Sequence, residues 1–268
     1  MCVSLNASRN SSLRLLLLFI VLPGLLAASA AVVETTDRTP GATIERPLGS
    51  IAKTPDLEVT GAAVRYLESL DLLVFEQTVR GRAGGTVPTA RGGMDGAPVL
   101  GHVFPTTLAP EDVGFGDAEG IVALAVTSHP DFDDTPLWDE NLNRRYDDDG
   151  VVFHPHWVVL VEDERVAGGL AVRQIADGVD LGSVLPPTHP GMPMYMDSPG
   201  FSVVLSGDTL KVLVPAARVG GRKDFRFDAV TAYMEVNPSG DGPMLGVYQV
   251  YAVLSGDLGL PYRVESAR

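Results

Sequence analysis

The chain has 268 residues, with 34 acidic against 20 basic side chains and a formal net charge of −14 at neutral pH. This charge argues against nucleic-acid binding and against adsorption to anionic membranes, because both surfaces are themselves negative. It suits an exported protein that collects cations, and it equally suits a protein adapted to a saline habitat. A single cysteine, Cys2, excludes a disulfide within the chain.

Residues 1–30 have the pattern of a secretory signal peptide. Two arginines precede or border the apolar run Leu15–Leu26, and Ala28-Ser29-Ala30 fits the small-residue rule for cleavage. The run is shorter than the roughly 20 residues that a spanning helix needs, and Pro23-Gly24 interrupts it. We therefore expect cleavage, no stable membrane insertion afterwards, and a secreted or periplasmic protein.

Residues 31–55 are predicted to be a linker or extended arm, because they combine breakers with no sustained periodicity. Residues 56–268 are long enough for a single domain with one well-buried core. In this domain, short apolar runs alternate with Gly- and Pro-containing turns, which is typical of many strands.

The strands can be placed from the alternation of apolar residues. In chain order they are expected at 59–66, 70–79, 99–104, 121–126, 154–161, 170–175, 201–205, 209–214 and 245–254. The clearest hairpin has Gly207-Asp208 at its tip, which suits a two-residue type II′ turn. The sequence therefore predicts an all-β fold, an antiparallel β-sandwich with a long irregular acidic loop.

Two parts of this domain resemble a known family. The first is Pro55-Asp56-Leu57-Glu58-Val59 with a hairpin ending Leu73-Val74-Phe75, and the second is Gly207–Pro215 followed by Phe225-Arg226-Phe227-Asp228. Both resemble strands of family 9 carbohydrate-binding modules and DOMON domains. The resemblance spans most of residues 56–254 and implies a secreted β-sandwich that binds sugar or haem.

The acidic loop has eight carboxylates between Asp131 and Asp149, and oxygen ligands of this kind suit calcium. In the loop 139–150, acids and amides occupy positions one, three, five and nine of a calcium-binding loop, but Arg144 and Gly150 exclude an EF-hand. The predicted calcium ligands are Asp133, Asp134, Asp139, Asn141, Asn143 and Asp147. The alternative is a solvated loop whose carboxylates pair with Arg144 and Arg145.

Three aromatic residues in and beside the loop, Trp138, Tyr146 and Trp157, are predicted to present their rings to a saccharide or a similar apolar-faced ligand. In this interpretation calcium fixes the loop and the protein binds a small molecule without catalysing a reaction. A third possibility is a structural envelope protein whose loop keeps an edge strand soluble.

His154-Pro155-His156 supports a rival interpretation. In a strand, residues two apart point to the same face, so both imidazoles could chelate zinc or copper. A third ligand could come from His129, Asp131 or Asp133. The chain would then be a metal-dependent enzyme with a neighbouring carboxylate as general base. Otherwise, these histidines form hydrogen bonds to the acidic loop or face solvent.

Met192, Met194 and Met196 alternate near His189. Thioether sulfurs suit copper(I), whereas an alternating row of methionines also suits a flexible apolar flap over a pocket. A G-x-S-x-G nucleophile motif is absent from the sequence.

Overall fold

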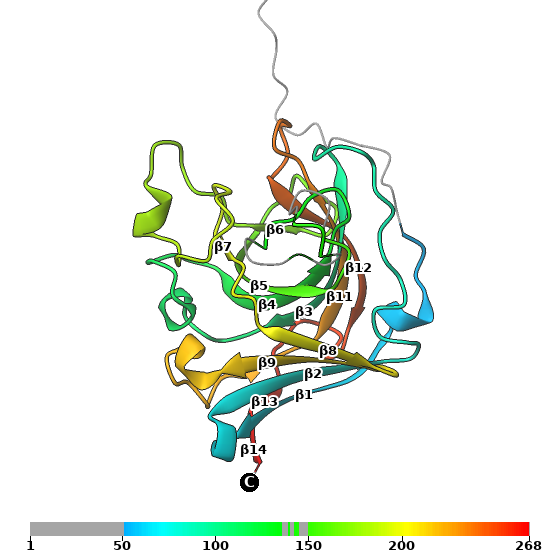
Figure 1. The fold of residues 1–268 in the computed structure, drawn as a ribbon, viewed down its shortest axis with the longest axis vertical. Coiled ribbons are helices and arrows are strands. Elements are labelled where there is room, and N and C mark those ends of the chain that lie inside the picture. Colours follow the sequence, from blue (N-terminus) through cyan, green and yellow to red (C-terminus); the bar gives the residue numbers. More distant parts are fainter. Residues whose placement is uncertain (1–50, 136–138, 140–141, 145–149, 268) are drawn as a thin grey trace, which may run out of the picture. The chain divides into compact units, whose positions relative to one another are not determined.

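The computed structural model describes residues 51–135, 139, 142–144 and 150–267 (Figure 1). The predicted signal peptide, residues 31–50 of the predicted linker, and Trp138, Asn141, Tyr146 and Asp147 lie outside these residues. The regular elements within them are β-strands and short 3-10 turns, which confirms the predicted all-β class. None of the described segments forms a helix that is long and apolar enough to cross a membrane.

The first sheet has five strands in the order β14-β1-β2-β9-β8. Its strands are β1 (Val59–Leu67), β2 (Leu72–Val79), β8 (Ser202–Ser206), β9 (Thr209–Pro215) and β14 (Glu265–Ala267). All neighbours are antiparallel except β1 and β14, which are parallel. The predicted β8–β9 hairpin forms, and Gly207 at its tip has the positive φ of 62° that such a tight turn needs.

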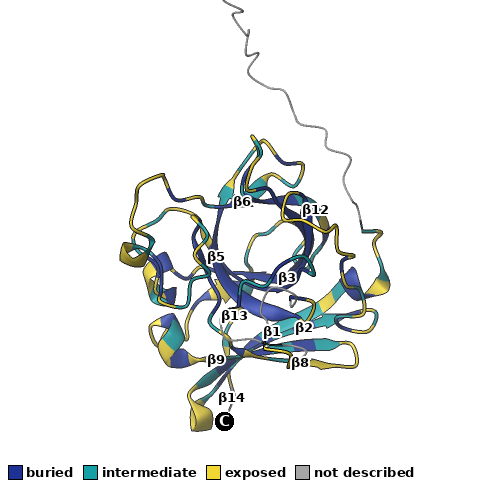
Figure 2. Cartoon of the chain, turned by 45° about the horizontal axis from the view of Figure 1, so that its top comes forward, coloured by how far each residue is buried: buried dark blue, intermediate teal, exposed yellow. Residues whose placement is uncertain are grey.

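The second sheet closes into a six-stranded barrel. Its strands are β3 (Ala97–Pro105), β4 (Ile121–Ser128), β5 (His154–Glu162), β6 (Leu170–Val172), β11 (Val230–Val236) and β12 (Leu245–Val253). The barrel is closed because β4 pairs with β3 on one side and with β5 on the other. Figure 2 shows this ring of mostly buried strands. The predicted antiparallel sandwich is thus correct, with one of its sheets closed on itself.

Smaller elements complete the fold. β7 (Met196–Asp197) adds to β5, and β10 (Arg226–Phe227) pairs with β13 (Tyr262–Arg263). The 3-10 turns are Pro55–Leu57, Glu68–Leu70, Pro110–Val113, Leu181–Ser183 and Ala216–Val219. Residues at the end of the predicted linker contact the domain, since Lys53 donates a hydrogen bond to the carbonyl of Tyr251.

Two hydrophobic cores result from the alternation of side chains along the barrel strands. One core fills the space between the five-stranded sheet and the outer face of the barrel, and the other fills the barrel interior. Along β5, Trp157 and Val159 belong to the first core, whereas Val158 and Leu160 belong to the second. Most residues of β3, β4, β5 and β11 are therefore buried on both faces of the strand.

Trp157 lies in the first core and is fully buried. Its ring packs edge-on against Phe75 with 6.1 Å between the ring centroids. This corrects the expectation that Trp157 presents its ring to a saccharide, because neither face of the ring is open to a ligand at the surface.

A buried histidine in β3, His102, makes the unfolding free energy depend on pH. The His102 ring is fully buried, and its Nδ1 lies 3.0 Å from Oε1 of Gln77. Burial lowers the pKa of His102 to about 4, although the charge of Asp56 opposes the shift. Because the unfolded chain takes up this proton near pH 6.5 and the folded chain does not, acidification favours unfolding.

We expect the unfolding free energy to fall as the pH drops from 7 to 5, with about 2 kcal/mol of that fall due to His102. Urea denaturation of the native protein and of His102→Gln at both pH values measures this contribution. Equal losses of unfolding free energy in the two proteins would contradict it.

Candidate metal centre

Three histidines meet where β4 ends and β5 begins. His154 and His156 are two residues apart on β5, so their side chains share one face of the strand. His129 follows the last residue of β4, and the antiparallel β4–β5 register pairs Thr127 with His154. Pro155 lies at the start of β5, where the strand pairs with β4 alone, as expected for a residue without an N–H.

A carboxylate completes the group. Oδ1 of Asp134 lies 3.3 Å from Nε2 of His129, 3.3 Å from Nε2 of His154 and 3.6 Å from Nε2 of His156. The Nε2 atoms of His129 and His154 are 2.8 Å apart, and one ligand atom from each of the four residues lies within 4.8 Å of the others. Ligands about 2.0–2.1 Å from a tetrahedral zinc ion lie about 3.3 Å from one another, so these separations suit one shared ion.

The Nδ1 atom of each of the three histidine rings also has a partner. Nδ1 of His129 lies 2.7 Å from the carbonyl oxygen of Phe132, and Nδ1 of His154 lies 2.7 Å from that of Val152. A carbonyl only accepts hydrogen bonds, so these two Nδ1 atoms are donors and the Nε2 atoms of the neutral rings present lone pairs. Nδ1 of His156 contacts Oγ of Ser198 at 3.0 Å. Metal-binding histidines are commonly oriented by partners of this kind.

The electrostatics of the four side chains are dominated by burial and by the single carboxylate. Burial alone would raise the pKa of Asp134, but His156 and His129 hold it well below its usual value. Burial alone would lower the pKa of His129, but Asp134 raises it. Burial lowers the pKa of His156 to about 3, with Asp134 opposing the shift. A carboxylate anion thus lies beside imidazoles in a buried site, where a bound cation would replace a proton.

The donor set distinguishes between metals. Three imidazole nitrogens and one carboxylate oxygen suit zinc or copper, whereas calcium takes six to eight oxygens. The structure therefore brings His129, His154 and His156 together as the metal-dependent interpretation requires.

The other predicted ligands have different partners. The carboxylate of Asp131 accepts hydrogen bonds from the backbone of Arg91 and Gly92. Oδ1 of Asp133 accepts one from the backbone of Thr135. The expectation that Asp131 or Asp133 joins the histidines is therefore corrected, because Asp134 is the carboxylate that reaches them among the residues with described positions.

Asp139 accepts hydrogen bonds from the backbone N–H groups of Asn143 and Arg144. The predicted calcium loop and its Trp138 and Tyr146 rings depend on residues outside those that the structure describes. Calcium at Asp139, Asn141, Asn143 and Asp147 therefore stays a prediction.

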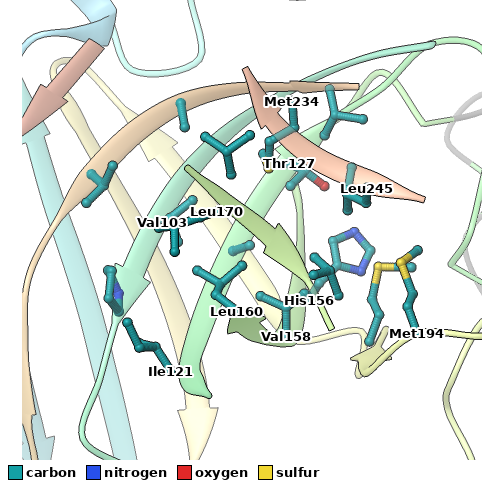
Figure 3. Close-up of a pocket in the computed structure, with 18 of the residues that line it drawn as sticks. Val103, Ile121, Thr127, His156, Val158, Leu160, Leu170, Met194, Met234 and Leu245 are labelled. Carbon is teal, nitrogen blue, oxygen red and sulfur yellow. The ribbon is translucent and has the colours of Figure 1, made fainter. Parts of the chain in front are cut away.

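The centre borders a cavity inside the barrel. His129, Asp134, His156 and Thr127 line one part of it, and apolar side chains line the rest. The cavity encloses about 70 Å³. Met192, Met194 and Met196 belong to its lining, and Figure 3 shows Met194 and His156 among the side chains that line it.

Comparison of the chain with protein-family models, with curated proteins and with solved structures found no match. The resemblance to DOMON domains and family 9 carbohydrate-binding modules therefore stays a prediction.

A glycine supports the position of His129. The backbone N–H of His129 donates to the carbonyl of Gly150, which has a φ of 103°. A Cβ atom at this position would overlap the carbonyl oxygens of Phe132 and His129 and would lie 3.0 Å from Nδ1 of His129. No pattern in the sequence predicts that Gly150 supports His129.

We expect Gly150→Ala to lower the unfolding free energy by roughly 2–4 kcal/mol and to weaken metal binding, because backbone strain and overlap act together. Gly256→Ala is the matched control, since Gly256 has a φ of 92° with nothing within 4 Å of an added Cβ. Thermal melts and metal titrations compare the variants. Equal effects of both substitutions would contradict a supporting role for Gly150.

Proposed function

We propose that this chain is a metal-dependent enzyme that holds one zinc or copper ion through His129, Asp134, His154 and His156. The observation that carries the proposal is the convergence of three Nε2 atoms and one carboxylate oxygen, with each Nδ1 occupied by a partner on the other side of its ring.

A hydrogen-bonded cluster without metal explains these contacts less well. Two Nε2 atoms that both present lone pairs lie 2.8 Å apart, so either a proton on His129, whose pKa Asp134 raises, or a cation separates them. Nε2 of His156 is buried and has no hydrogen-bond partner within the described part of the chain, and such an atom costs about 1–3 kcal/mol. One ion would satisfy all three nitrogens and the carboxylate.

Access to the ion supports catalysis over a purely structural role. His129, Asp134 and His156 line the barrel cavity, so a small molecule there could reach the metal. Four protein ligands fill a tetrahedral zinc shell, so a molecule in the cavity would bind as a fifth ligand, a coordination number that catalytic zinc sites also reach. In the buried site the ion would act as a Lewis acid or activate a bound water, and copper would add redox chemistry.

A metal titration tests the proposal. After chelator treatment, calorimetry should show one zinc or copper ion bound per chain, with an affinity that calcium does not match. Asp134→Asn should weaken binding at least tenfold, because it removes the one anionic ligand among the described residues. The matched control is Asp131→Asn, whose carboxylate contacts backbone N–H groups instead.

Failure of the native protein to bind either metal would overturn the proposal. Equal weakening by Asp134→Asn and Asp131→Asn would also contradict it, because that result would attribute binding to the general negative charge of the loop.

A further inference from the structure

Most of the barrel interior is lined by apolar side chains, and its polar side chains belong to or adjoin the metal centre. Its only polar lining residues are Thr127, His129, Asp134 and His156, among the residues that the structure describes. Figure 3 places Ile121 well away from His156, with apolar side chains such as Val158 and Leu160 between them. The lining extends along β4 from Ile121 to Thr127, which is roughly 20 Å at about 3.4 Å per residue. The space that this lining leaves open is about 70 Å³.

The apolar lining reaches solvent. Ile121 is 37% exposed and Val250 is 38% exposed, and both line the cavity. Leu258 and Leu260, in the segment after β12, complete this part of the lining. Both leucines have positive φ angles, of 59° and 49°, a conformation that non-glycine residues rarely adopt. Exposed apolar side chains around a cavity are typical of a ligand-binding site.

The cavity can adapt to a larger molecule. Met192, Met194, Met196 and Met234 line it, and methionine side chains are unbranched and change rotamer easily. A ligand that exceeds the present volume would need these side chains to move.

The hydroxyl group of Thr127 lies near the metal centre and can bind a ligand. Oγ1 of Thr127 is buried and has no hydrogen-bond partner among the described residues. Thr127 pairs with His154 in the β4–β5 ladder and lines the cavity with His156. A ligand atom at the metal could therefore also bond to this hydroxyl.

We propose that the ligand of the metal centre is a mainly hydrocarbon molecule with one oxygen-bearing end, which binds lengthwise inside the barrel. The oxygen binds the metal near Thr127, and the hydrocarbon part lies against the valine, leucine and methionine side chains. This inference rests on the proposed metal-dependent function.

The lining excludes more polar ligands from this cavity. A sugar would bury several hydroxyls against side chains that offer no hydrogen bonds, which is unfavourable. A molecule with a single polar end avoids this cost, and each additional methylene gains from burial.

The test uses native protein loaded with zinc, or with cobalt as a spectroscopic substitute. Hexanoate, octanoate and decanoate, with the matching alcohols, are titrated by calorimetry. Affinity should rise about threefold to fourfold per methylene until the barrel is full. Binding should also change the visible spectrum of the cobalt form. Stronger binding of the carboxylates assigns an anionic end, and stronger binding of the alcohols assigns a neutral one.

Ala232→Phe should fill the interior and weaken ligand binding at least tenfold while metal binding persists, because Ala232 lines the cavity and is not a metal ligand. Ala217→Phe, at an exposed position, is the matched control. If Ala232→Phe does not fold, Val250→Asp places a charge at an exposed part of the lining and should have the same effect.

Three results would overturn this inference while zinc binds normally and the proposed function stands. The protein could bind none of the carboxylates or alcohols, bind them with an affinity that does not depend on their length, or bind them equally well without metal. Failure to bind zinc or copper would overturn both.

Discussion

The pairing of β4 with β5 is the contact on which the rest of the structure depends. It closes the barrel, since these strands would otherwise be opposite edges of an open sheet. It also places His129, just beyond the end of β4, beside His154 and His156 at the start of β5. Fold closure and metal geometry thus come from one ladder of backbone hydrogen bonds. Strands are rigid supports for such a site, because their side-chain directions are fixed by the pleat.

The two faces of the barrel strands have different roles in the domain. Outward-facing side chains such as Trp157 and Tyr233 form the core shared with the five-stranded sheet, which supplies much of the buried apolar surface. Inward-facing side chains enclose a cavity whose polar lining, among the described residues, consists of Thr127 and three of the four metal ligands. The outward face therefore packs against the five-stranded sheet, whereas the inward face lines the cavity beside the metal centre.

Much of the fold follows from local sequence, whereas the site depends on long-range contacts. Alternation predicts β1, β2, β8 and β9, and the HPH triplet predicts two imidazoles on one face of β5. β11 is missed because its buried residues include Thr231 and Glu235, so neither an apolar run nor a regular alternation marks it. Barrel closure joins strands about 30 residues apart, which no local pattern encodes. Asp131, Asp133 and Asp134 are chemically alike, so only the conformation of their loop selects Asp134.

The most direct test of the central claim is the coordination shell of the ion itself. X-ray absorption spectroscopy of the zinc-loaded protein should reveal three imidazole nitrogens and one carboxylate oxygen at about 2.0–2.2 Å. Loss of one imidazole from that shell in His156→Ala would assign the centre to the start of β5. A shell made of oxygens alone, or one unchanged in His156→Ala, would contradict the account.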